Sequence, residues 1–165
     1  MKKPFYLLIF MSLGLLVGCS SGINFNISFD QKGGFGMKEV DGGFAVNTLE
    51  FVDTLEELKD LCDEWNNPAF NKNSENYSSE NSEKIRSYDE SFFAEKILVI
   101  YSFDTGYNKE TRIDSIVVDG EQLIINTRIK TKRGTFESVG FNWLMLIDIN
   151  KSDVEGITSI QVMNK

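Results

Sequence analysis

The chain contains no histidine, only two cysteines and only two prolines among its 165 residues. Without histidine, the commonest general base, the Ser/His and Cys/His nucleophile pairs and the commonest metal ligand are all missing. The carboxylates fall on the surfaces of expected helices, and none forms a pair in an apolar setting that would separate two pKa values. The sequence therefore predicts a protein that is not an enzyme and that has no metal and no cofactor.

Basic side chains are also scarce. Lysine and arginine number 17 against 25 aspartates and glutamates, which gives a formal net charge of −8. Such a surface repels phosphate backbones and anionic lipid headgroups. Nucleic acid is therefore excluded as a partner, and any attachment to a membrane has to come from lipid rather than from basic residues.

A hydrophobic run long enough to span a bilayer is missing as well. The apolar run at residues 5–17 has 13 residues, whereas a spanning helix needs roughly 20. Because Lys2 and Lys3 precede it, the segment is typical of an export signal. The run ends in Leu16-Val17-Gly18-Cys19, which resembles the bacterial lipobox at each of its four positions.

The lipobox resemblance implies that residues 1–18 are a lipoprotein signal peptide and that Cys19 is lipidated with at least two acyl chains. It places the protein outside the cytoplasm, anchored by lipid to the cell membrane or envelope. Loss of Lys2 and Lys3 leaves a formal charge of −10. Acylation of Cys19 also leaves Cys62 without a partner in the chain, which excludes a disulfide.

Residues 19–43 are rich in glycine, serine and asparagine and are predicted to be a tether. The alternation of Asn, Phe and Ile at 24–29 leaves an edge strand open as the alternative. Residues 44–165 are long enough for a single β-rich domain with one hydrophobic core.

Two helical segments are expected in this domain. In the first, 54–65, Thr54 and Glu57 form a capping box, apolar residues recur at helical spacing, and Asn-Asn-Pro at 66–68 ends the helix. Cys62 lies on the apolar stripe with no cationic neighbour in sequence, so it is interpreted as a core residue. The second is a short turn at 88–93 capped by Asp89. The polar tract at 71–84 between them is expected to be an exposed loop.

The other segments show the pattern of strands. A first strand is expected at 44–52, and the apolar run at 97–103 is typical of a central strand. Segments 112–118 and 123–129 form a hairpin around Asp119-Gly120, and further strands are expected at 141–149 and 156–163. A polar loop at 130–140 lies between them. The fold class predicted is mainly β with one helix (α+β), as an antiparallel β-sandwich or a partly open barrel.

One segment between two of these strands is the candidate partner-binding loop: Asp104, Thr105, Gly106 and Tyr107. Gly106 permits a backbone turn, and Tyr107 is an amphipathic aromatic at the expected loop tip. In the alternative, Gly106 turns the chain and Tyr107 covers the core. The neighbouring loop at 131–139, beside the basic cluster Lys130, Lys132 and Arg133, either adds to this surface or is a solvated hairpin end. Phe141 and Trp143 share a strand face and are interpreted as core residues.

Residues 88–162 resemble the C-terminal domain of the protease-complex B-subunit family. The shared features are Tyr-Asp-x-x-Phe-Phe at 88–93, the strand at 97–103, a loop ending in Gly-Tyr, a hairpin turned by glycine, and Leu-Ile-Asp-Ile at 146–149. That family is related in plan to the chagasin-type protease inhibitors, which present a Thr-Gly-Tyr loop on an immunoglobulin-like sandwich. Thr105, Gly106 and Tyr107 match those three positions. A second glycine before the tyrosine, a Pro-rich segment after the hairpin and an Arg-Pro-Trp loop are not shared.

Together these features predict a membrane-anchored extracytoplasmic lipoprotein that acts as a protein-binding module. The resemblance implies a protease-associated or inhibitor-like role with a protease as partner. The alternative is a structural or assembly lipoprotein of the cell envelope with no protease link, in which a sheet edge pairs with another protein.

Overall fold

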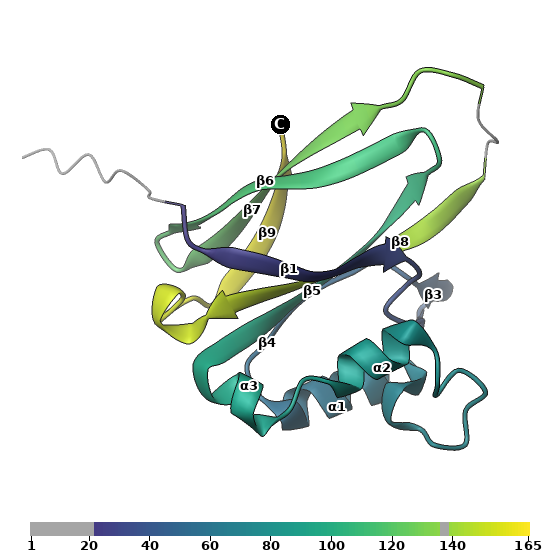
Figure 1. The fold of residues 1–165 in the computed structure, drawn as a ribbon, viewed down its shortest axis with the longest axis horizontal. Helices are drawn as coiled ribbons and strands as arrows, with labels where there is room; N and C mark the ends of the chain where they lie inside the picture. The colour runs from purple at the N-terminus through teal and green to yellow at the C-terminus, as the bar shows by residue number, and fades with distance from the viewer. Residues whose placement is uncertain (1–21, 136–138) are drawn as a thin grey trace, which may run out of the picture.

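The computed structural model describes residues 22–135 and 139–165, which form three layers (Figure 1). The middle layer is a four-stranded sheet with the order β1 (Phe25–Lys32), β8 (Gly140–Asn150), β5 (Lys96–Gly106) and β4 (Thr48–Val52). The second layer is a three-stranded sheet with the order β6 (Lys109–Asp119), β7 (Gln122–Thr131) and β9 (Ser159–Asn164). The two sheets remain separate, which confirms the mainly β, sandwich-like α+β class.

The third layer is helical. It contains α1 (Leu55–Glu64), the 3₁₀ turn η1 (Pro68–Phe70), α2 (Glu80–Arg86) and α3 (Glu90–Glu95). These helices cover the face of the four-stranded sheet that points away from the three-stranded sheet. A small hairpin of β2 (Lys38–Val40) and β3 (Gly43–Ala45) precedes β4, and the 3₁₀ turn η2 (Lys151–Asp153) follows β8.

Alternation along the central strands produces two hydrophobic cores. In β5, Leu98 and Ile100 pack with the helices, whereas Ile97 and Val99 pack with the three-stranded sheet. Because successive side chains of a strand point to opposite faces, one continuous apolar run can supply both cores. The expected central strand at 97–103 is therefore confirmed, and it is covered on both sides.

Local capping chemistry sets the starts of the helices as expected. The Thr54 hydroxyl accepts a hydrogen bond from the Glu57 amide at 3.1 Å, and the Glu57 carboxylate accepts one from the Asp53 amide at 3.0 Å. Asp89 accepts from the Phe92 amide at 3.0 Å. Each cap satisfies amide groups that have no partner within the first helical turn.

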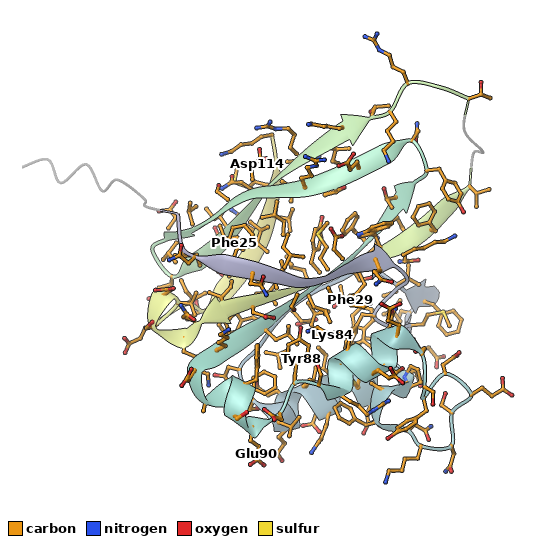
Figure 2. All side chains as sticks on the ribbon, in the orientation of Figure 1. Phe25, Phe29, Lys84, Tyr88, Glu90 and Asp114 are labelled. Carbon is orange, nitrogen blue, oxygen red and sulfur yellow. The ribbon has the colours of Figure 1, made fainter. Side chains whose placement is uncertain are left out.

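Residues 19–43 were predicted to be a tether, and the structure corrects this for most of residues 22–43. Phe25–Lys32 form β1, an edge strand antiparallel to β8, which is the alternative that the alternation at 24–29 had left open. The side chain of Ser28 donates to Asp148 at 2.7 Å and lies 2.5 Å from the Tyr88 hydroxyl, while Phe29 is buried in the helical core. Figure 2 shows Phe29 and Tyr88 between β1 and the helices. Residues 19–21 lie outside the described part of the chain.

Other boundaries also differ from the sequence-based expectation. The strand expected at 44–52 is divided, because residues 43–45 pair with β2 and residues 48–52 pair with β5. The loop expected at 71–84 ends in α2, where Ser79 is the N-cap and Ile85 is buried. The sequence did not indicate this helix because only one side of its two turns contacts the core, so most of its residues are polar.

The last strand adds a parallel pair to a fold that is otherwise antiparallel. The hairpin of β6 and β7 forms around the turn that contains Gly120 (φ +61°). The chain then crosses to the four-stranded sheet as β8 and returns through η2 to form β9, which is parallel to β7. This parallel pairing was not anticipated, because it depends on which sheet holds β8.

Candidate functional site

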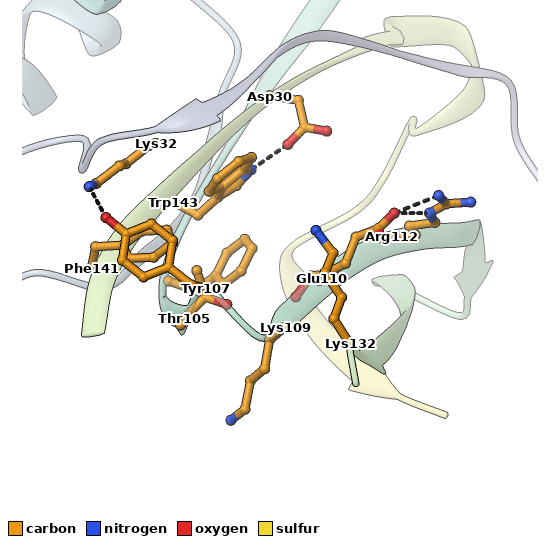
Figure 3. Close-up of a pocket in the computed structure, with 13 residues that line it drawn as sticks. Asp30, Lys32, Thr105, Tyr107, Lys109, Glu110, Arg112, Lys132, Phe141 and Trp143 are labelled. Carbon is orange, nitrogen blue, oxygen red and sulfur yellow. Dashed lines mark hydrogen bonds and ion pairs between the residues drawn. The ribbon is translucent and has the colours of Figure 1, made fainter. Parts of the chain in front are cut away.

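A groove opens at one end of the sandwich, where β5 leaves the four-stranded sheet and the chain turns into β6. Its volume is about 470 Å³, within the range of roughly 300–1,000 Å³ found for ligand clefts. Four aromatic side chains line it: Phe103, Tyr107, Phe141 and Trp143. Six charged side chains join them: Asp30, Lys32, Lys109, Glu110, Arg112 and Lys132. We call this site the aromatic groove (Figure 3).

The aromatic wall comes from the register of two neighbouring strands. Phe103 of β5 lies opposite Trp143 of β8, and Thr105 lies opposite Phe141. These side chains continue the face that forms the core between the two sheets, but at the end of the sandwich they are only partly buried. Phe141 and Trp143 were interpreted as core residues. Trp143 does pack against the core between the sheets, but both side chains are only partly buried, and they extend this face into an accessible wall.

Tyr107 closes one side of the groove. It lies in the two-residue turn between β5 and β6, and its side chain is 42% exposed. Its ring centroid is 4.8 Å from that of Phe141. The Lys32 ammonium donates to the Tyr107 hydroxyl at 2.9 Å and lies 4.8 Å from the centre of the Phe141 ring. Lys32 thereby links Tyr107, through a hydrogen bond, to Phe141, through a cation–π contact.

The two carboxylates of the groove are engaged by neighbours. The indole N–H of Trp143 donates to Asp30. Glu110 accepts from the Arg112 guanidinium at 2.6 Å, and this hydrogen bond together with the Arg112 charge lowers the pKa of the Glu110 carboxyl. The more distant charges of Lys132 and Lys130 act in the same direction. Glu110 is therefore an ionised, oriented side chain and a poor proton donor.

The structure places the predicted site residues as follows. Thr105, Gly106 and Tyr107 all line the aromatic groove, but Asp104 does not. Asp104 accepts from the Asn47 side chain at 3.1 Å and belongs to the alternate set of β5 side chains, which face the helical layer. The observed loop is shorter than expected. Strand β5 continues to Gly106, opposite Gly140, and only Tyr107 and Asn108 form the turn.

The structure describes only some of the other residues that the sequence singled out. Of the basic cluster beside the loop at 131–139, Lys132 lines the groove. Residues 136–138 of that loop, and the lipidation site Cys19, lie outside the described residues. Cys62 is fully buried in the helical core, as its place on the apolar stripe predicts.

Sequence reasoning missed the groove residues that β1 and β6 supply. Asp30 and Lys32 were assigned to the tether, yet both project from the end of the alternating β1 pattern toward β8 and the β5–β6 turn. The alternation at 24–29, extended by three more residues to Lys32, is the signal that could have found them. Glu110 and Arg112 of β6 carried no local signal, because their role depends on the neighbouring sheet.

Comparison with family models, curated proteins and solved structures found no match to this chain. Within residues 22–135 and 139–165, no helix is both long and apolar enough to cross a bilayer. In the same described part of the chain, no three or more Cys, Asp or Glu side chains converge to form a metal site.

Proposed function

We propose that this chain is an extracytoplasmic lipoprotein, anchored through Cys19, whose β domain binds a protein partner in the aromatic groove. The lipobox-like Leu16-Val17-Gly18-Cys19 supports the anchor. The groove supports binding, because it combines aromatic walls with polar groups at the end of a rigid sandwich. Such a combination suits the recognition of a protein segment, in which a few aromatic contacts contribute most of the affinity.

The observation that carries this proposal is the fixed position of the exposed Tyr107 ring. An exposed tyrosine usually gains mobility from its exposure, but here Lys32 and Phe141 hold the ring beside the groove. An aromatic ring held in place loses little conformational entropy when a partner binds. The same residue was the tip of the loop that the sequence singled out.

The chemistry of the groove favours binding over catalysis. Asp30 and Glu110, its two carboxylates, are occupied by Trp143 and Arg112. General acid–base catalysis needs a group whose pKa lies near the working pH, and the pKa of Glu110 is displaced downward. We therefore propose no catalytic step for this site.

A protease remains the partner that the family resemblance implies. We propose association with a protease rather than inhibition, because Thr105 and Gly106 are paired within β5 and only two residues form the turn. A loop that enters a protease cleft would have to extend beyond the sheet. In the alternative, an assembly lipoprotein, an edge strand such as β6 pairs with another protein. Charged side chains along β6, among them Glu110 and Arg112, oppose that pairing.

The proposal is tested by photo-cross-linking on intact cells that carry the full-length protein. A photoreactive residue at Thr111, in the groove, is compared with one at Ser152, in η2 at the other end of the sandwich. We expect a protein to be captured from position 111 and not from position 152. Tyr107→Ala should weaken binding of that captured protein about tenfold, and Tyr107→Phe, which keeps the ring, should weaken it less.

Equal capture from both positions would remove the groove from the contact surface. Capture from position 111 that is unaffected by Tyr107→Ala would instead favour the edge-pairing alternative. Recovery of the protein without acyl chains would exclude the lipid anchor independently of either result.

A further inference from the structure

The aromatic groove is a basic site on an acidic domain. Of its six charged side chains, four are cationic: Lys32, Lys109, Arg112 and Lys132. The chain as a whole has a formal charge of −8. Because exposed charges act over about 8–10 Å at physiological salt, an approaching ligand experiences the local positive charge rather than the distant negative sum.

Two of these cations form no ion pair among the described residues. Arg112 is paired with Glu110, and Lys32 is bound to the Tyr107 hydroxyl. Lys109 and Lys132 take part in none of the ion pairs found within residues 22–135 and 139–165. In Figure 3 the Lys132 side chain projects toward the groove, while that of Lys109 extends outward from its rim.

The opposite end of the sandwich has the other sign. The turn between β6 and β7 and the connection between η2 and β9 expose Asp119, Glu121 and Glu155. The lysine of η2, Lys151, is partly buried and donates to the Asp53 carbonyl at 2.9 Å. The domain is therefore electrically polar along its length, basic at the groove and acidic at the far end. This arrangement would orient an acidic partner toward the groove as it approaches.

From these charges and aromatic walls we propose that the aromatic groove binds an acidic, extended segment of its partner, in which an aromatic side chain is flanked by Asp or Glu. The partner's aromatic ring packs against Phe141 and Trp143, and its carboxylates pair with Lys109 and Lys132. This inference rests on the proposed function and adds the chemical class of the segment that is bound.

The test uses full-length protein purified in detergent and fluorescently labelled peptides, with binding followed by anisotropy. The acidic probe contains Glu-Asp-Phe-Asp-Glu, and its neutral isostere contains Gln-Asn-Phe-Asn-Gln. A third probe, Glu-Asp-Gly-Asp-Glu, lacks the aromatic ring. We expect the acidic aromatic probe to bind at least about fivefold more tightly than either of the others, and its affinity to fall as salt rises.

Lys109→Gln and Lys132→Gln should each weaken binding of the acidic aromatic probe about two- to fivefold, as exposed ion pairs contribute. The matched control is Lys72→Gln, which removes the same charge from an exposed position outside the groove. Circular dichroism of each variant distinguishes a loss of folding from a loss of binding.

Several results would overturn the inference: equal affinity for the acidic and neutral probes, no effect of either groove lysine, or no binding of any probe. Stronger binding of a sulfated oligosaccharide than of the acidic peptide would assign the groove to another class of anion. If the partner captured from position 111 binds through a segment without acidic residues, the inference fails while the proposed function stands.

Discussion

At the scale of single residues, burial controls the chemistry of the one described cysteine. The Cys62 side chain has no exposed surface, and burial, with a smaller effect of the Asp63 charge, raises the pKa of its thiol to about 12. An unfolded thiol ionises near pH 8.5. Between about pH 8.5 and pH 12 the unfolded chain therefore loses a proton that the folded chain keeps, and stability falls as pH rises.

We expect a thiol reagent at pH 8 to modify Cys62 only after the protein is unfolded in denaturant. We also expect the free energy of unfolding to fall by about 1–2 kcal/mol more in the wild type than in Cys62→Ala between about pH 8 and pH 10. Denaturant titrations at the two pH values measure this difference. Equal pH dependence in the two proteins, or rapid labelling of the folded protein, would contradict the assignment of Cys62 to the core.

The sequence pattern identified Cys62 correctly as a core residue. For Tyr107 it left open a surface aromatic and a cover for the core, and the 42% exposure of the side chain favours the first. The pattern did not identify Lys32 as the partner of Tyr107, because 75 positions separate the two residues in sequence. The same holds for Asp30 and Trp143, which are 113 positions apart. Contacts of this kind arise only when distant strands are placed side by side.

At the scale of structural elements, the glycine-rich segment after β1 is a packed connection rather than a spacer. Phe35 is 1% exposed, and the Asn67 side chain donates to its carbonyl. Gly36 lies so close to α1 that an added Cβ would overlap the Trp65 carbonyl oxygen. The composition is typical of a flexible linker, but here the glycine allows the backbone to approach that of Trp65 closely.

Gly36→Ala should therefore lower the free energy of unfolding by about 2–3 kcal/mol, in the range of overpacking in a core. The matched control is Gly34→Ala, whose added Cβ meets its nearest atom, Cβ of Asn142, at an ordinary 3.5 Å. We expect little change for the control in a denaturant titration. Similar stability of the two variants would restore the interpretation of this segment as a tether.

Elements whose ends are set by local chemistry were predicted well. The capping residues Thr54 and Asp89 and the turn at Gly120 act on neighbours within a few positions. Elements that need a distant partner were predicted less well. Examples are β1, which depends on β8, and α2, whose few apolar contacts come from the helical core.

At the scale of the whole molecule, the start of β1 and the groove lie at opposite ends of the domain. The Ile23 amide is bound to the Ile116 carbonyl at 2.9 Å, and β1 then runs the length of the sandwich to Lys32 at the groove. Figure 1 shows the start of β1 beside the β6–β7 turn and η2. Only residues 20–22 separate Cys19 from Ile23. That is a reach of roughly 14 Å at about 3.5 Å per residue.

With Cys19 lipidated as we propose, the end that contains η2 should lie near the membrane and the groove should face away from it. A fluorophore at Ser152→Cys should be quenched strongly by spin-labelled headgroups in vesicles, and one at Lys109→Cys should be quenched weakly. A long Gly-Ser insertion after Ser20 should reduce the difference. Equal quenching at both positions without the insertion would show that the short connection does not orient the domain.

The sequence by itself determined the secondary structure of the central strands, the helix caps and the mainly β class. It did so because alternation, capping and turn chemistry act between residues that are close along the chain. The apolar run of β5 also indicated a strand covered on both faces.

Only the tertiary structure decided that β1 belongs to the four-stranded sheet, that β9 runs parallel to β7, and that an aromatic groove opens at one end. The place of β1 depends on pairing between segments more than a hundred residues apart, as between Asn26 and Asp148. Strand order and register follow from the packing of both cores at once, and no local pattern encodes which edge receives a given strand.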